Sequence, residues 1–157
     1  MGKVLKGLIQ YNGIDDYYYK TLKNFKQVNL NKIICIPAYK SSISEITKVW
    51  IDYNILDYEF INTPMGTSLE GQCLTGKKVF ISANLVIKIE YMTINNWETV
   101  CSSYHTIPIC IYVTIDDDFD ECSSIYPTIL IEDIYCEQLD RQNIYLNTVL
   151  IGIADFC

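Results

Sequence analysis

The residues of this sequence with the widest chemistry are its cysteines, since a thiolate can form a disulfide, hold a metal or attack a carbonyl. The chain contains seven of them. They are Cys35, Cys73, Cys101, Cys110, Cys122, Cys136 and Cys157. Because the number is odd, at least one cannot pair within a monomer, and we expect its partner to lie outside the chain.

Metal binding is the first alternative use for these thiols. A zinc site needs about four ligands held at close spacing. The sequence has no CxxC pair and a single histidine, His105, so its ligands would have to come together from distant loops. The acidic run DDDFDE, 116–121, could hold calcium, but it lacks the alternating ligands and the glycine of an EF-hand loop. We predict a solvated loop tip there, and no metal or cofactor.

Nucleophilic catalysis is the second alternative. His105 has Cys101 and Ser103 close by in the sequence. Neighbours on a strand point to opposite faces, however, so we interpret His105 as a surface or interface residue. The tyrosines at 17–19 could stack on sugars or bases, but packing or interface contact is the favoured role. With no GxSxG, HExxH or glycine-rich phosphate loop, the sequence predicts that the protein is not an enzyme.

The composition argues against several classes of partner. The 157 residues suffice for one domain, and the heavy use of Ile and Tyr is typical of strands. A formal net charge of -7 argues against nucleic acid, whose binding depends on clustered Lys and Arg. No apolar run approaches the roughly 18 to 20 residues that span a bilayer, so we predict no membrane insertion. The first residues lack a secretory pattern, which indicates synthesis in a cytosol.

The elements that must position these residues are strands. The clearest is KKVFISANLVIKIEYMT, 77–93, where apolar and polar residues alternate with a period of two. Further strands are predicted over 25–39, 49–62, 98–115, 125–139 and 143–156. The strand 98–115 should bend or break near Pro108, because proline cannot donate to a central ladder. Both faces of 125–139 carry apolar groups, as in a strand buried on both sides or at a subunit contact.

The segments between the strands are less regular. Ser42 followed by Glu45 is a capping-box pattern, which predicts one or two helical turns over 41–48. Glycines and a proline make 63–76 a loop. Residues 1–24 are predicted as an N-terminal arm or short helix, and 25–157 as one all-β domain, an antiparallel sandwich or open barrel with little helix. Open strand edges on such a fold are places where a second copy can add.

The order of these elements resembles a known family. The segments 39–60, 76–115 and 127–153 together resemble the SPOCS domain of clostridial spore-coat and exosporium proteins. The similarity includes a Gly-Lys turn that opens a long strand ending in an aromatic, Gly76 to Tyr91, and a proline corner at Pro108 and Ile109. Ser41 and Ser42 stand where the family tends to have proline, Ile109 replaces its phenylalanine, and no LysM module is present.

This resemblance implies a structural protein of a bacterial spore surface layer. Such proteins are made in the mother-cell cytoplasm without a signal peptide and deposited on the spore, as coat or exosporium. Their cysteines would be reduced during assembly and become intersubunit staples after the mother cell lyses. We expect Cys157, on a mobile tail, to be the best placed of the seven for this role.

Three hypotheses follow from the sequence. The leading one is a protein that self-associates into sheets, rings or fibres and is then locked by intersubunit disulfides, with itself and other spore-coat proteins as partners. The second is a morphogenetic adaptor that binds another coat protein without forming a lattice. The third is an enzyme or carbohydrate-binding module that uses His105, Cys101 or the tyrosines.

Overall fold

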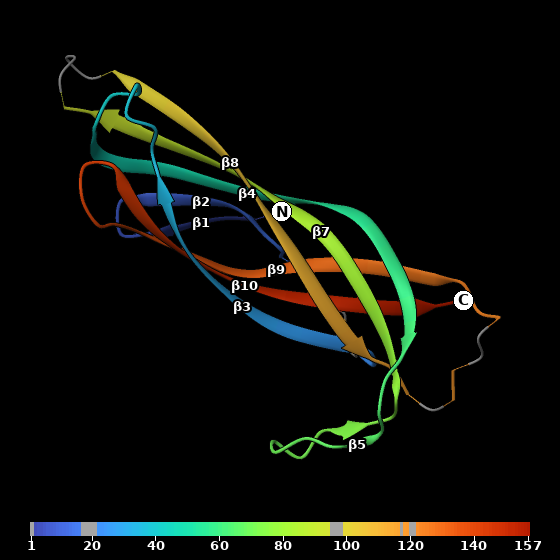
Figure 1. Cartoon of the computed structure of the whole chain (residues 1–157). Helices are drawn as coiled ribbons and strands as arrows, with labels where there is room; N and C mark the ends of the chain where they lie inside the picture. The colour runs from blue at the N-terminus through green and yellow to red at the C-terminus, as the bar shows by residue number, and fades with distance from the viewer. Residues whose placement is uncertain (1, 17–21, 95–98, 117, 120–121) are drawn as a thin grey trace.

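The computed structural model describes the whole chain except residues 1, 17–21, 95–98, 117 and 120–121 (Figure 1). The described residues form strands and connecting segments and contain no helix, which confirms the all-β prediction. The strands are β1 (Gly2–Lys6), β2 (Ile9–Ile14), β3 (Phe25–Cys35), β4 (Ile43–Asn62), β5 (Gly66–Thr67), β6 (Cys73–Leu74), β7 (Lys77–Thr93), β8 (Val100–Thr114), β9 (Ile125–Gln138) and β10 (Asn143–Phe156).

Two sheets share one hydrophobic core. The larger has the strand order β1-β2-β4-β7-β8, and the smaller has the order β3-β10-β9. All pairs are antiparallel except β2 with β4, which is parallel. The short β5–β6 hairpin projects from the end of the larger sheet (Figure 1).

The core follows from simple alternation. In β7 the side chains from Val79 to Tyr91 at every second position are buried, and those between them are mostly half-exposed. They pack against the inner face of the smaller sheet, including Ile129 and Ile144. Full burial of one such aliphatic side chain stabilises the fold by about 1.5 to 3 kcal/mol.

Several predicted strands have the expected bounds. The strands β7 and β10 match the predicted 77–93 and 143–156, and β9 ends one residue before the predicted limit. The strand β8 runs through Pro108 without a break. Among the described residues, β8 is an edge strand that pairs only with β7, and Pro108 is exposed on it. Proline is tolerated on an edge strand because its missing N–H can face the open side, where no ladder hydrogen bond is lost.

Besides the break expected near Pro108, two further predictions about local structure were wrong. The segment 41–48 is not helical, because β4 already begins at Ile43. Register shifts near Ser44 and Thr47 bury Ile43, Ile46 and Val49, a spacing of three that resembles a helix in the sequence. Within 1–24, the described residues 2–14 form the β1–β2 hairpin of the larger sheet instead of an arm or helix, while Tyr17 to Tyr19 lie outside the described residues.

The strand β9 owes its two apolar faces to a bulge. Ile131 pairs with Leu150 and Asp133 pairs with Val149, so the intervening Glu132 has no counterpart in β10. The side chains that face the core therefore change from Ile129 and Ile131 to Ile134 and Cys136. On the opposite face, a small cluster joins Leu130, Ile151, Ile153 and Leu22, so this double burial lies within the chain.

Candidate functional site

Five of the seven cysteines are exposed at the surface. They are Cys35, Cys73, Cys110, Cys122 and Cys157. They lie on β3, on β6, on β8, in the loop before β9 and after the end of β10, so they are distributed over the molecule. The structure contains no disulfide between any two of the seven. Cys101 is half-buried and lies opposite Tyr91 in the β7–β8 pair.

Cys136 does not fit the predicted cross-linking role. Its side chain points into the core from β9 and is only 3% exposed. Burial raises the pKa of its thiol to about 12, so almost none of it is the reactive thiolate at neutral pH. The bulge at Glu132 turns Cys136 inward, and simple alternation in the sequence could not show this.

Cys157 is exposed, as predicted, but it is not on a mobile tail. Its backbone N–H donates to Ser124 O, and the Ser124 N–H donates to Cys157 O, at 3.2 and 3.3 Å. The backbone of Cys157 is therefore held beside the start of β9, and its thiol is exposed there.

His105 and Ser103 form a hydrogen bond that sequence reasoning did not anticipate. Both side chains, with that of Cys101, lie on the same face of β8 because they are two residues apart. The distance from Ser103 Oγ to His105 Nε2 is 2.7 Å. Burial, with a smaller contribution from the charge of Lys40, lowers the pKa of His105, which favours the neutral imidazole. Ser103 is only 2% exposed, whereas His105 is half-buried and lines a surface cavity beside β3.

In the acidic run, Asp116 and Asp118 are exposed outside the strands, as predicted for a solvated loop, while 117 and 120–121 lie outside the described residues. Phe119 differs from them, because it stacks on Phe60 and packs on Phe156, with ring centroids 5.2 and 4.3 Å apart, at the end of the core. Asp116, Asp118 and Phe119 line a cavity of about 440 Å³ here. Among the described residues, no three His, Cys, Asp or Glu side chains are grouped closely enough to hold a metal, and 117 and 120–121 lie outside that set.

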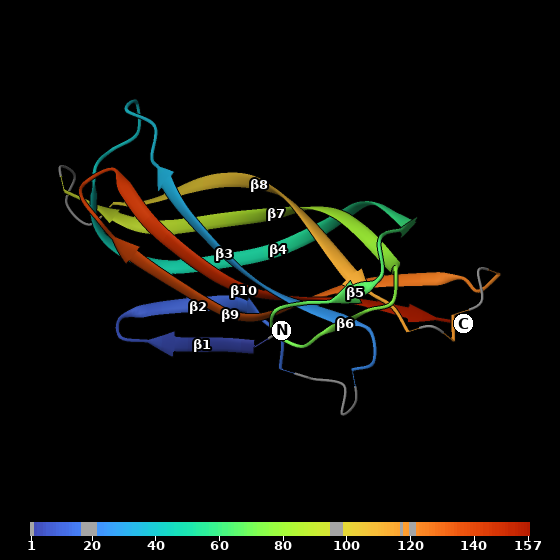
Figure 2. The same ribbon diagram turned by 60° about the horizontal axis from the view of Figure 1, so that its bottom comes forward.

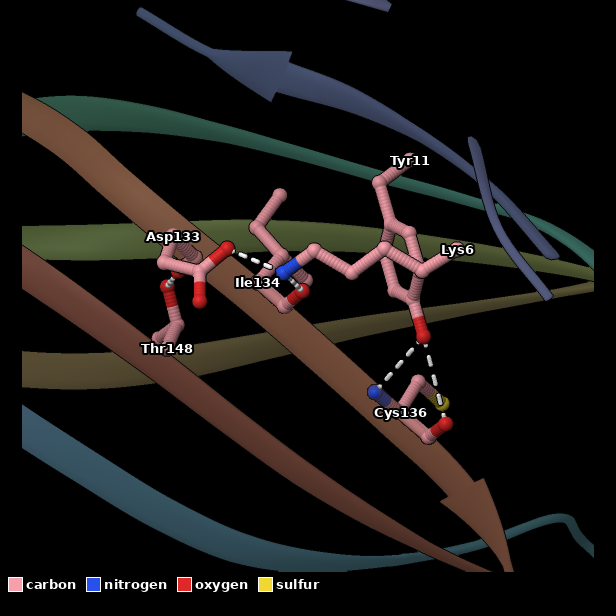
Figure 3. A network of polar contacts seen from close by, with 6 residues as sticks. All are labelled: Lys6, Tyr11, Asp133, Ile134, Cys136 and Thr148. Atoms are coloured by element: carbon pink, nitrogen blue, oxygen red, sulfur yellow. Dashed lines mark hydrogen bonds and ion pairs between the residues drawn. The ribbon is translucent and has the colours of Figure 1, made fainter. Parts of the chain in front are cut away.

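The β1–β2 hairpin supplies a polar network that closes one edge of the smaller sheet (Figure 3). The Tyr11 hydroxyl donates to Cys136 O at 3.2 Å and accepts from the Cys136 N–H at 2.9 Å. The Lys6 ammonium forms an ion pair with Asp133 and donates to Ile134 O. The Asp15 carboxylate accepts a hydrogen bond from the Ile131 N–H, and the Asp15 backbone N–H donates to Ile131 O. These contacts take the place of a neighbouring strand along β9.

The outer face of the larger sheet carries aromatic rings and lysines in register. Trp50, Lys88 and Tyr104 are direct cross-strand neighbours on β4, β7 and β8. The Lys88 ammonium lies 4.7 Å from the Trp50 ring centroid and 5.6 Å from that of Tyr104. The row stabilises this face of the sheet through cation–π contacts.

Comparison with known proteins adds no relative. No family model, curated protein or solved structure matches this chain. Among the residues described, none belongs to a helix long and apolar enough to cross a membrane.

Proposed function

We propose that this protein is a structural, self-associating component of a bacterial spore surface layer, cross-linked through its surface cysteines. The observation that carries the proposal is the exposure of five cysteines on five separate segments of an all-β fold. A thiol at the surface can meet a thiol of a neighbouring molecule, whereas a buried one cannot. Several such positions on one molecule allow links in more than one direction.

Exposed apolar side chains support the same proposal. Leu69 and Met65 project from the β5–β6 hairpin and its base, and Tyr39 and Leu8 are also largely exposed. Interface cores favour aromatic and aliphatic groups over charged ones. Association through such contacts would come first, and disulfides would then hold the contacts against dissociation.

The chemistry of the cross-link is an oxidation. Two thiols lose two protons and two electrons to an external oxidant such as molecular oxygen, and one sulfur–sulfur bond forms. A reducing mother-cell cytoplasm would keep the thiols apart during assembly, and exposure to oxygen outside would join them. The resemblance to SPOCS domains supports deposition on the spore, with other coat proteins as further partners.

Electron microscopy and non-reducing electrophoresis of the purified protein test this proposal. After exposure to air we expect ordered sheets, rings or fibres, and covalent multimers that dithiothreitol removes. A variant with Ser at the five exposed positions should lose the multimers, and the matched Cys136→Ser variant should keep them. A monomer at high concentration, identical on reducing and non-reducing gels, would contradict the proposal. A small defined oligomer that instead captures another coat protein would favour the adaptor.

A further inference from the structure

The larger sheet has a stepped edge. The strand β2 pairs with β4 only at Lys48 to Trp50, and β1 lies outside β2. Beyond this point β4 continues to Asn62 with β7 on its other side. Within the described residues, no strand pairs with the β2 side of β4 from Asn54 to Asn62. Figures 1 and 2 both show β1 and β2 beside the first half of β4 and the second half running past them.

The exposed half of β4 is acidic. Asp52, Asp57 and Glu59 are exposed on the outer face of the sheet, and residues 52–62 contain no Lys or Arg. The Asp52 carboxylate accepts a hydrogen bond from the Tyr53 N–H at 2.8 Å, and Asp57 accepts one from the Tyr58 N–H at 2.9 Å. The two carboxylates therefore accept hydrogen bonds from backbone N–H groups that would otherwise bond to an added strand.

The strand β1 has the complementary properties. It contains Lys3 and Lys6 and no acidic residue, and the ammonium of Lys6 is already paired with Asp133. Lys3 and Leu5 are exposed on the face opposite Val4, which packs against the core. Lys3 therefore lies on the same outer face as the carboxylates of β4.

The turn between β1 and β2 fixes which backbone groups of β1 face outward. Lys6 pairs with Ile9 across the two-residue turn at 7–8, where Gly7 has φ of 62°. The residues that flank such a turn bond to each other, so Lys6 and Val4 bond to β2. The N–H and C=O of Leu5 consequently point away from the sheet.

We propose that two copies of this chain join through these edges, with the β1 strand of each copy adding to the 54–62 edge of β4 in the other. A rotation of 180° about the normal to the larger sheet places each β1–β2 hairpin in the step left by the other copy. Both contacts form at once, so the assembly is a closed two-fold dimer. This inference rests on the proposed self-association and names its first interface.

The geometry also sets strand direction and charge contacts. Because β1 is antiparallel to β2 and β2 is parallel to β4, the incoming β1 runs parallel to the β4 that it meets. The outer faces of the two copies form one continuous surface, which brings Lys3 of one copy to the acidic row of the other. Asp52 and Asp57 then exchange their bonds to their own backbone for contacts with the incoming lysine.

Two matched pairs of variants test the interface by sedimentation in dithiothreitol, which excludes disulfides. The unaltered protein should sediment at twice the 18.1 kDa of one chain. Leu5→Pro removes the outward N–H and should weaken the dimer at least tenfold, whereas Leu5→Ala keeps that N–H and should dimerise. Tyr58→Pro and Tyr58→Ala form the same comparison on β4. Circular dichroism identifies any variant that does not fold. If one proline variant fails to fold, the comparison at the other position tests the interface.

The outcomes separate this interface from the proposed function. Dimers equally tight in both proline variants, or a dimer that Lys3→Glu leaves unchanged, would overturn the edge contact while self-association stands. A protein that is monomeric at every concentration, in air as well as in dithiothreitol, would overturn both.

Discussion

Tyr11 shows how one side chain can replace a strand. Its hydroxyl satisfies both backbone groups of Cys136 from the interior of the molecule, where its ring is only 1% exposed. Burial is the largest cause of its raised pKa, so the phenol keeps its proton and remains a donor. The two hydrogen bonds join the β1–β2 hairpin to the smaller sheet.

The Tyr11→Phe variant should therefore be destabilised by about 1 to 3 kcal/mol, because it leaves a buried N–H and a buried C=O without a partner. Urea denaturation followed by tryptophan fluorescence measures this loss. The control is Tyr135→Phe, which removes an exposed hydroxyl bonded to Glu137 and should change stability by less than about 0.5 kcal/mol. Equal effects of the two variants would contradict the structural role of Tyr11.

Cys136 predicts how stability depends on pH. The folded thiol has a pKa of about 12, against an ordinary value of 9.0. Between these values the unfolded chain loses the proton and the folded chain keeps it, so stability falls as pH rises. By pH 10 this thiol alone should cost about 1.4 kcal/mol relative to pH 8.

The Cys136→Ala variant isolates this effect, because its loss of stability from pH 8 to 10 should be smaller by that amount. Urea denaturation in dithiothreitol at the two pH values provides the comparison, with the exposed Cys110→Ala as control. Parallel pH profiles for Cys136→Ala and the unaltered protein would show that the buried thiol does not titrate as described.

At the scale of elements, the contact between β2 and β4 depends on a glycine. Gly13 has φ of 113°, which side chains rarely adopt, and a Cβ there would lie 2.0 Å from the carbonyl oxygen of Ile51. Since that atom belongs to the backbone, neither strand can move aside without breaking its pairing.

We expect Gly13→Ala to lower the free energy of unfolding by about 2 to 4 kcal/mol. The matched control is Gly66→Ala, which meets nothing within 4 Å and is not among the glycines with positive φ. Thermal melts of the two variants give the comparison. If Gly13→Ala melts like Gly66→Ala, the close approach of β2 to β4 is not required for the fold.

The strands that could be predicted are those with unbroken alternation. The strand β7 has no bulge against β8, so its bounds follow from a period of two. The start of β4 could not be predicted, because two register shifts produce a helix-like spacing from Ile43 to Val49. The β1–β2 hairpin was missed although Gly7 marks its turn, since its strands are short and β1 is half-exposed.

At the scale of the whole molecule, the sequence could suggest that the cysteines act together in cross-linking, but it could not show which of them are exposed. Their positions depend on pairs far apart in the sequence, as between Tyr11 and Cys136 or Ser124 and Cys157. The register of those pairs is fixed by turns and bulges, which sequence patterns specify poorly. The number of thiols thus suggested a cross-linked assembly, while the structure decides which of them a neighbour can reach.

The edges of the two sheets are treated differently across the molecule. The edge of β9 is closed by the side chains of the hairpin, β8 carries an exposed proline, and β4 is guarded by two carboxylates. Each device limits uncontrolled strand addition. In the proposed dimer the two carboxylates of β4 exchange these bonds for contacts with an incoming Lys3, so this edge is protected against strands that lack such a lysine.

The position of β10 between β3 and β9 has a consequence for synthesis on the ribosome. Both neighbours precede β10 in the chain, so they emerge before the strand that joins them exists. During that interval β3 and β9 have no mutual pairing and expose apolar faces. Release of 143–156 from the exit tunnel therefore triggers completion of the smaller sheet, and a nascent chain stalled before that point is a candidate for chaperone binding.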